Sequence, residues 1–594
     1  MDYLDVPFNA GLLIRKKKSI KKELLSSVNS FLCKKIAILG GSTTQEVADQ
    51  MELFLLNYGI KPSFYQSDFG RYYEDAVFGN PVLEEFNPDI IYIHTSWRNI
   101  SKFPDYGDTD DVISKNLVEE FDKFKRMWEQ LFSRFHCPII QNNFDRPDYR
   151  VLGNRDIWDS HGRSNFIFRL NSMFYDYSQK KEHFFINDLD YISADIGLQN
   201  WDDHKSWALY KYACSINSIP YLAKSVSDII KSIFGKNKKV LSLDLDNTIW
   251  GGVIGEDGVN NISIGKETAV GQVYSSFQEY CRGLKNIGTI LTINSKNNED
   301  TALEGLNHPE NILKKDDFVC IKTNWNSKDK NFIETSKELS LGLDSFVFVD
   351  DNPSEREIVK KLLPEVSVLN ANQPNEYLNL LDHSGFFEVT YLTKEDFAKT
   401  EQYSLRMKAI TESYSYTDYT EYLSNLNMKA TIYSFEAPYI QRIAQLTNKT
   451  NQFNLTTLRC SDSDIEKMHN SKDRLCLCAR LVDKFVDNGI VTVISGIYKD
   501  DCLELDLWLM SCRVLKRNLE QALMDYIVKK VTSIGIKKIR GIYIPSNRNS
   551  IVADFYKDMG FSFLYQKESI FYWELNTDEY RLNNPPIEIH ENNS

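Results

Sequence analysis

Two aspartates separated by one residue follow a buried-strand pattern in the middle of the chain. The stretch that begins at Val240 reads VLSLDLDNTIW, so Asp244 and Asp246 lie at the end of an apolar run. Side chains alternate between the faces of a strand, and a bend after the strand can aim both carboxylates at one spot. Two converging carboxylates suit Mg²⁺, and an aspartate beside the metal can attack phosphorus. Taken alone, these residues fit a polar loop after a core strand equally well.

Two later apolar segments also end in side chains that phosphoryl transfer requires. One ends in the hydroxyl of Ser295, another ends in the carboxylates of Asp350 and Asp351, and Lys328 lies between them. A hydroxyl and an ammonium can hold phosphate oxygens, while a further acid completes a metal shell. The order Asp-x-Asp-x-Thr, Ser, Lys, Asp-Asp resembles the haloacid dehalogenase (HAD) superfamily.

Longer motifs point to one family within this superfamily. DLDNTIWGGVIGEDG begins at Asp244 and DDNPSERE begins at Asp350, while LTNKTNQFNLTT begins at Leu446 and MSCRVL begins at Met510. These motifs resemble the FkbH-like family, a class IIIC branch of the HAD superfamily. The resemblance covers most of residues 30–575.

The resemblance implies a role for each matching residue. Asp244 would be the nucleophile and a metal ligand, and Asp246 would act as general acid and base while its backbone carbonyl faces Mg²⁺. Ser295 and Lys328 would hold the phosphoryl oxygens, and Thr248 would support the turn.

The remaining metal ligand is either Asp350 or Asp351. Asp351 is slightly preferred, but successive residues point to opposite sides, so the sequence does not decide which one faces inward. Asn352 and Pro353 then fit the N-cap and the first position of a helix.

One position departs from the family pattern. Relatives that load a carrier protein often have cysteine immediately before the Ser-Lys of the second motif, where its thiol can accept an acyl group, whereas this chain has Asn294. Because an amide nitrogen is not a usable nucleophile, acyl transfer here would have to reach an external acceptor directly or use a distant thiol.

The function implied by the resemblance is removal of phosphate from a small phosphorylated acid or its acyl derivative. Characterised relatives act on 1,3-bisphosphoglycerate and deliver a glyceryl unit to an acyl carrier protein, so biosynthesis of a secondary metabolite or a surface polysaccharide is expected. Two alternatives remain: an acyltransferase that works through the third domain, and a non-catalytic component that docks a carrier protein. The intervals between the site residues hold only ordinary connections, which predicts an open site without a large cap domain.

The first predicted domain, residues 1–235, resembles an SGNH-hydrolase-like α/β domain of flavodoxin-like type. A buried strand is followed by Gly-Gly-Ser and a helical pattern, which places Ser42 at the nucleophile position and Asn99 or Asn142 at a donor position. The acid next to His204 is not at the expected spacing, and without a base Ser42 would be a poor nucleophile. A domain that binds a substrate or partner is therefore favoured over a hydrolase.

The HAD-like phosphatase domain is predicted at residues 236–385 and a GNAT-like (N-acetyltransferase-like) domain at 386–578. In the GNAT-like domain, Arg513 and Arg517 could hold an anionic group, or they could simply start a solvated helix. The family often has glycine where this chain has Lys516 and Asn518, so coenzyme A binding is in doubt. The predicted fold class is thus α/β multidomain, with a capless Rossmann-like HAD core between an α/β and an α+β domain.

Composition limits the partners. The chain has 594 residues and a net charge of −13, which argues against nucleic-acid binding. It has neither an apolar run long enough to cross a membrane nor a signal-peptide core, so a cytoplasmic protein without membrane insertion is expected. The cysteines are scattered, which predicts neither zinc nor disulfides. The polar tail at residues 579–594 is expected to be poorly ordered.

Overall fold

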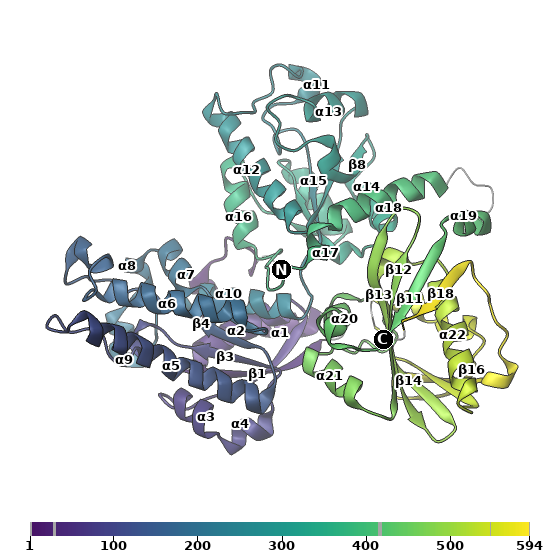
Figure 1. Ribbon diagram of the computed structural model, residues 1–594. Helices are drawn as coiled ribbons and strands as arrows, with labels where there is room; N and C mark the ends of the chain where they lie inside the picture. Colours follow the sequence, from purple (N-terminus) through teal and green to yellow (C-terminus); the bar gives the residue numbers. More distant parts are fainter. Residues whose placement is uncertain (1–2, 28–30, 414–418, 547, 593–594) are drawn as a thin grey trace. The chain divides into compact units, whose positions relative to one another are not determined.

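The computed structural model describes residues 3–27, 31–413, 419–546 and 548–592 (Figure 1). The chain divides into two compact units, Met1–Ile233 and Phe234–Ser594. The first unit contains one sheet and the second contains two. The three domain ranges expected from the sequence remain predictions. None of the helices in the described part has the length and apolar character needed to span a membrane.

The first unit is built on a five-stranded parallel sheet of order β2-β1-β3-β4-β5. This is the strand order of flavodoxin-like doubly wound folds, which agrees with the fold class expected from the sequence. The strands are β1 Leu32–Gly40, β2 Ile60–Gln66, β3 Ile90–His94, β4 Ile139–Asn142 and β5 Phe184–Asn187. The main helices are α1 Ala10–Ser27, α2 Gln45–Asn57, α3 Tyr72–Phe78, α4 Pro81–Phe86, α5 Asp110–Phe135, α6 Arg163–Lys180, α7 Leu189–Ile196, α8 Leu198–Trp201, α9 His204–Tyr210 and α10 Ile219–Ile233.

Continuous apolar runs explain why these strands lie inside the sheet. All five residues of β3 are buried, as are the last five of β1. Strands that helices cover on both faces need apolar side chains on both faces, which these runs supply. The long helix α5 packs its buried stripe, including Phe124 and Trp128, into an aromatic core with Phe174.

The first sheet of the second unit is also parallel, with the order β10-β9-β6-β7-β8. Its central strand β6 lies between β9 and β7. Within residues 240–368, all of which the structure describes, helices and loops connect the strands and no separate domain is inserted. The strands are β6 Val240–Leu243, β7 Ile290–Ser295, β8 Phe318–Thr323, β9 Phe346–Val349 and β10 Ser367–Val368. The helices are α11 Ile254–Asp257, α12 Ala269–Asn286, α13 Glu299–Leu306, α14 Lys328–Leu339, α15 Pro353–Leu362 and α16 Tyr377–His383.

The last sheet has eight strands in the order β16-β17-β15-β14-β13-β12-β11-β18. Strands β11 to β14 are antiparallel neighbours, β14 and β15 are parallel, and β15, β17 and β16 are again antiparallel. Helix α22 connects β14 to β15. This mixed order fits the α+β domain that the sequence predicted. Its elements are β11 Met428–Tyr433, α20 Ala437–Lys449, α21 Asp462–Asn470, β12 Arg474–Val482, β13 Asp487–Lys499, β14 Cys502–Met510, α22 Leu519–Ser533, β15 Lys538–Tyr543, α23 Phe555–Asp558, β16 Ser562–Lys567, β17 Ile570–Asn576 and β18 Ile587–Glu591. Helices α17 Lys394–Phe397, α18 Lys399–Ser413 and α19 Tyr419–Asn425 precede it.

The expectation of a poorly ordered tail is wrong for part of residues 579–594. Strand β18 pairs in parallel with β11 from Met428 opposite Ile587 to Ile432 opposite Glu591. The alternation of Ile587 and Ile589 with polar residues is the signal that composition alone missed, because such alternation fits a strand with one buried face.

Candidate active site

Polar residues meet where β6, β7 and β9 end. Asp244 follows β6, Ser295 is the last residue of β7, and Asp350 follows β9. The three strands are neighbours in one parallel sheet, so their carboxyl ends share an edge. The backbone N–H of Asp244 donates to the carbonyl of Val349 at 3.0 Å, which fixes the ends of β6 and β9 against each other.

Lys328 supplies a buried cation at this edge. It is the first residue of α14, and its side chain is only 3% exposed. Its Nζ lies 3.0 Å from Oδ1 of Asp244 and forms an ion pair with Oδ2 of Asp350. Burial alone would lower the pKa of Lys328, but the carboxylates of Asp244 and Asp350 outweigh that effect and raise it. The lysine therefore stays charged at neutral pH.

Three carboxylates form a compact acidic cluster beside this lysine. Oxygens of Asp244, Asp350 and Asp351 all lie within 4.8 Å of one another. Burial and then the charge of Asp244 raise the pKa of Asp350 to about 6, and the same two causes raise the pKa of Asp351. Oδ1 of Asp244 lies 3.0 Å from Lys328 Nζ, and this lysine supplies one positive charge to three carboxyl groups. The cluster is therefore short of positive charge.

Both predicted candidates for the last metal ligand belong to the cluster. Oδ1 of Asp350 accepts from the backbone N–H of Asn352 at 2.8 Å. Arg356, which is 5% exposed, donates from Nη1 to the backbone carbonyls of Asp350 and Asp351 at 2.7 and 2.9 Å. Helix α15 begins at Pro353, with Asn352 as the predicted N-cap, and places Arg356 one turn later. The role of Arg356 in holding this turn was not predicted.

Asp246 lies outside the acidic cluster. Strand β6 ends at Leu243, and the backbone turns through Asn247 at a φ of 52°. Oδ1 of Asp246 accepts from Trp250 Nε1 at 2.9 Å and from the backbone of Ile254 at 3.1 Å, while Oδ2 accepts from Asn297 Nδ2 at 2.9 Å. Its carboxylate is thus fixed by the loops after β6 and β7. Asn297 is a contributor that the sequence analysis missed.

The two predicted hydroxyls are both buried near the strand ends. Ser295 is 2% exposed at the end of β7, and Thr248 is fully buried in the turn after β6. The Thr248 Oγ1 has no hydrogen-bond partner among the described residues, although its backbone N–H donates to the carbonyl of Leu245 at 3.1 Å. The supporting role expected of Thr248 in this turn remains a prediction.

Asn294 is the last predicted residue of this edge. Its Nδ2 donates to the backbone carbonyl of Lys328 at 2.9 Å, and its Oδ1 accepts from Asn331 Nδ2 at 3.0 Å. Asn331 also donates to Oδ1 of Asn324 at 3.1 Å. A chain of amides therefore connects β7, the loop after β8 and the first turn of α14. Neither Asn331 nor Asn324 was singled out as a site residue, although both lie within a few residues of Lys328.

The predicted hydrolase residues of the first unit are brought together only in part. Asn99 Nδ2 donates to the carbonyl of Gly41, next to Ser42, at 2.9 Å, and its Oδ1 accepts from the backbone of Ser96 at 3.0 Å. A Cβ on Gly41 would lie 2.2 Å from this Nδ2, so a larger residue there would displace the Asn99 side chain. Both ends of the Asn99 amide are thus used inside the protein. Asn142 is similarly committed, because its amide bonds to Tyr92, His94, Thr95 and Asn187.

Ser42 lacks a base in this arrangement. Its Oγ is buried and has no hydrogen-bond partner in the described part of the chain. His204 is exposed and contacts Asp148 at 3.2 Å, and burial lowers the pKa of His94 to about 4. The geometry therefore gives no support to a Ser–His hydrolase.

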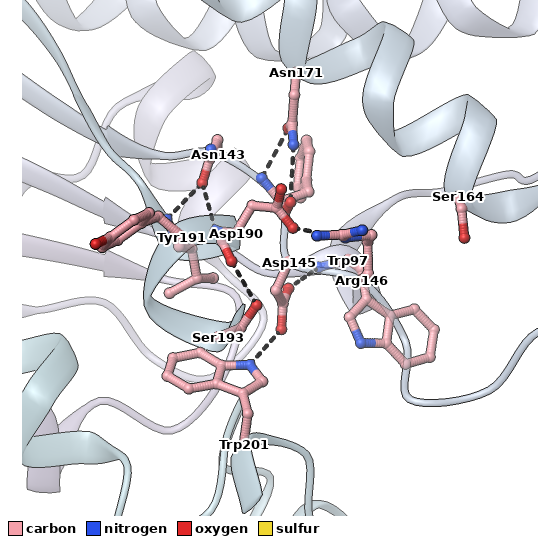
Figure 2. Close-up of polar contacts among 12 residues, drawn as sticks. Trp97, Asn143, Asp145, Arg146, Ser164, Asn171, Asp190, Tyr191, Ser193 and Trp201 are labelled. Carbon is pink, nitrogen blue, oxygen red and sulfur yellow. Dashed lines mark hydrogen bonds and ion pairs between the residues drawn. The ribbon is translucent and has the colours of Figure 1, made fainter. Parts of the chain in front are cut away.

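A buried carboxyl group organises the turn after β4 in the same unit (Figure 2). Oδ1 of Asp145 accepts from the backbone of Trp97 at 3.0 Å, and Oδ2 accepts from Trp201 Nε1 at 2.8 Å. Asn171 bonds to both the N–H and the carbonyl of Phe144, each at 2.8 Å. Burial raises the pKa of Asp145 to about 6 despite these hydrogen bonds.

The basic residues of the last domain have protein partners. Arg517 forms a buried ion pair with Asp483, whose carboxylate also accepts from Asn488. Arg513 Nη1 donates to Gln402 Oε1 at 2.6 Å. Arg517 is therefore part of the protein's internal structure and unavailable to an external anion.

The turn before α22 keeps an unusual backbone without glycine. Lys516 and Asn518 have φ angles of 65° and 62°. Nearby, the backbone of β14 is already paired, because Leu455 N–H donates to the carbonyl of Trp508 and Met510 N–H donates to that of Phe453. This part of β14 therefore offers no free edge to an added ligand strand or amide.

Comparison with known proteins gives one family-model match and one similar solved structure of note. Residues 35–231 match the family model described as FkbH, N-terminal domain. The crystal structure of the N-terminal part of BF1531 from Bacteroides fragilis, which contains a phosphatase domain complexed with Mg, is 29% identical with a TM-score of 0.59. The alignment covers 64% of this chain and 99% of that one.

Other similarities are weaker. The ribosomal-protein-S18-alanine N-acetyltransferase from Escherichia coli is 14% identical over 26% of this chain and 97% of its own, with a TM-score of 0.20. The GNAT domain of S. lividans PAT is 13% identical over 24% of this chain and 89% of its own, with a TM-score of 0.21. The α+β assignment of the last domain rests on the strand order of its sheet. No curated protein sequence matches this chain.

The variant Asp145→Asn should change how stability depends on pH. The pKa of Asp145 rises from 3.8 to about 6 on folding, so its carboxyl contributes stability that is fully present below pH 3.8 and is lost as the pH rises through about 6. Between about pH 4 and pH 7, wild type should lose on the order of 1–3 kcal/mol relative to the variant. Thermal unfolding of both full-length chains across this range measures the effect.

The exposed Asp176→Asn provides the control and should follow the wild type at every pH. A constant difference between wild type and Asp145→Asn at all pH values would contradict the raised pKa.

Proposed function

We propose that this chain, whose place in the FkbH-like family is supported by the family-model match and the structural neighbour, is a Mg²⁺-dependent phosphatase of the HAD type. The observation that carries the proposal is the cluster of Asp244, Asp350 and Asp351 with the buried ammonium of Lys328 against it. Acidic groups and a fixed cation at the carboxyl edge of a parallel sheet suit the transfer of a charged phosphoryl group.

The acidic cluster fits a divalent cation. Lys328 offsets only one of three negative charges. Asp244, Asp350 and Asp351 would hold Mg²⁺, with the backbone carbonyl of Asp246 as a further oxygen. When bound, Mg²⁺ neutralises charge on the phosphoryl oxygens and acts as a Lewis acid.

The reaction follows from the side chains. A carboxylate oxygen of Asp244 attacks phosphorus, the bond to the leaving oxygen breaks, and Asp246 gives that oxygen a proton. Asp246 then takes a proton from a water that attacks the aspartyl-phosphate, which releases inorganic phosphate and restores Asp244. Lys328 and the hydroxyl of Ser295 offset the charge on the group being transferred.

The proposed substrate is a small phosphorylated acid or acyl phosphate, of the 1,3-bisphosphoglycerate or phosphoglycerate type. Because no domain is inserted among the strands of this sheet, the substrate could be presented on something bulky, such as the arm of an acyl carrier protein. Since Asn294 stands where carrier-loading relatives often have cysteine, a glyceryl unit would pass directly to its acceptor. We place this activity in the cytoplasm, in secondary-metabolite or surface-polysaccharide biosynthesis.

The acyltransferase alternative has less support. Lys516 and Asn518 put Cβ atoms on the two left-handed positions of the turn before α22, where close approach of a pyrophosphate to the backbone favours glycine. The pairing of β14 with residues 453–455 also leaves its backbone without free groups there. A carrier-docking component without catalysis remains the other alternative, and the experiment below separates it from an enzyme.

Asp244→Asn should abolish phosphate release. An amide cannot replace the carboxylate nucleophile, so turnover should fall by about 1,000-fold or more. The assay measures free phosphate from 1,3-bisphosphoglycerate with Mg²⁺ and a panel of phosphopantetheinylated carrier proteins, with intact masses from the same tubes. EDTA should abolish the wild-type signal.

The exposed Asp316→Asn controls for charge removal elsewhere in the same unit and should retain full activity. A glyceryl mass shift together with Asp244-dependent phosphate release would establish carrier loading, whereas phosphate release alone would indicate a phosphatase of a small molecule. Phosphate release that is unchanged in Asp244→Asn would refute the proposed nucleophile.

Lys328→Met should bind Mg²⁺ more tightly while losing activity. Removing the ammonium next to Asp244 and Asp350 leaves three carboxylates without a neutralising partner, so Mg²⁺ affinity should rise by about tenfold, since a nearby unit charge contributes on the order of 1–4 kcal/mol. Turnover should fall by about 100-fold or more, because the cation also stabilises the transferring group. Calorimetric titration with MgCl₂ measures the affinity.

Lys322→Met is the matched control, because Lys322 pairs with Glu334 and Glu338 instead of the acidic cluster. Its Mg²⁺ affinity should equal that of the wild type. Weaker binding in Lys328→Met would mean that the lysine does not face the metal-binding carboxylates.

A further inference from the structure

We propose that Asn294 is a positioning residue that holds the Lys328 ammonium between Asp244 and Asp350. The inference rests on the proposed phosphatase function, because it concerns a group that acts on the transferring phosphoryl. It gives Asn294 a task other than the acyl acceptance that a cysteine could perform at the same position.

The contact with Lys328 is direct and buried. Asn294 is 2% exposed at the second-last position of β7, and its Nδ2 donates to the backbone carbonyl of Lys328 at 2.9 Å. Lys328 begins α14, and the N-cap residue Ser327 makes no side-chain capping bond. Asn294 therefore supplies a side-chain anchor to the first turn of this helix.

The orientation of the Asn294 amide is fixed by its other end. Oδ1 accepts from Asn331 Nδ2 at 3.0 Å, and the same Nδ2 donates to Asn324 Oδ1 at 3.1 Å. Asn324 in turn donates its backbone N–H to the carbonyl of Ser295 at 3.2 Å. The side chain next to Ser295 must therefore both donate and accept a hydrogen bond, which a carboxamide can do and a carboxylate cannot.

The anchor matters because Lys328 has several partners to reach at once. Its ammonium contacts Asp244 and Asp350 and lies 5.4 Å from the centre of the Phe348 ring. The side chain is almost completely buried, so its path is set by where the backbone of α14 begins. If that backbone moves, the ammonium loses contact with one carboxylate or the other, and charge compensation in the reaction weakens.

A cysteine at this position could accept an acyl group but would hold Lys328 less well. A thiol is a weak donor and a weak acceptor, so it could not replace both amide bonds of Asn294. We expect a chain with asparagine here to favour precise phosphoryl removal, at the cost of a covalent acyl intermediate.

The test compares Asn294→Ala and Asn294→Asp with Lys328→Met and with the double variant Asn294→Ala/Lys328→Met, all as full-length chains. Asn294→Ala should lower kcat by about 10–100-fold while KM changes by no more than about threefold, because the effect is on charge placement during reaction. Asn294→Asp should behave like Asn294→Ala, since it cannot donate to the Lys328 carbonyl. The double variant should be no slower than Lys328→Met.

Asn311→Ala is the structural control. Asn311 is 3% exposed in the same unit, and its Nδ2 donates to the carbonyl of Gly305 at 3.1 Å, so its removal leaves a comparable buried carbonyl. Asn311 Oδ1 has no partner among the described residues, whereas both ends of the Asn294 amide are bonded, so Asn311→Ala should lower the unfolding temperature by somewhat less than Asn294→Ala. It should leave kcat within about twofold of wild type. If Asn294→Ala and Asn311→Ala lowered kcat equally, Asn294 would contribute only to stability and the inference would be overturned. Additive effects of Asn294→Ala and Lys328→Met on kcat would overturn it as well.

Magnesium affinity separates failure of this inference from failure of the proposed function. A displaced ammonium should let Mg²⁺ bind more tightly, so Asn294→Ala should shift the Mg²⁺ affinity in the same direction as Lys328→Met but by less, while Asn311→Ala leaves it unchanged. This readout needs no turnover. If wild type releases no phosphate but the shift is present, the proposed function fails and the positioning role stands; if wild type is active and the shift is absent, only the positioning role fails.

Discussion

The ion pair of Lys328 with Asp244 and Asp350 is the constraint around which this edge of the sheet is arranged. Several ionised groups brought out of water in one place are costly unless they are paired and hydrogen-bonded. The neighbouring residues meet that demand: Asn294 anchors the start of α14, and Arg356 holds the backbone of the Asp350–Asp351 turn. The remaining excess of negative charge is what suits the cluster to a divalent cation.

Much of this arrangement could be predicted, because the relevant signals are local in sequence. Apolar runs that end in Asp244, Ser295 and Asp350 predict strands with reactive side chains at their carboxyl ends. The parallel order β9-β6-β7 brings those ends together. The α/β multidomain class expected from the motifs is confirmed. Residues 35–231 match the model of the FkbH N-terminal domain, in line with the resemblance of the motifs. The roles assigned to individual residues remain predictions, although the structure places most of them at one edge.

What could not be predicted depends on contacts between segments that are distant in sequence. The direction of the Asp246 carboxylate is set by Asn297, which follows a different strand. Arg517 has the sequence context of an anion site, yet Asp483 on another loop already neutralises it. The alternation at Ile587 and Ile589 is a local signal for strand β18, but its partner β11 lies far earlier in the chain. No local pattern encodes such pairings, since they result from how the segments pack.

The acidic cluster and its lysine come from one continuous stretch of chain, Asp244 to Asp351. Residues 240–368, which contain this stretch, form their own parallel sheet, and the hydrogen bonds that orient Lys328, Asp246 and the Asp350 turn all arise within them. A gene segment that encodes such a centre can be inherited as one unit, because recombination before or after it would separate none of these hydrogen-bond and ion-pair partners. Neighbouring domains could then diverge or be exchanged over evolutionary time, altering which molecules are delivered while the chemistry is transmitted intact.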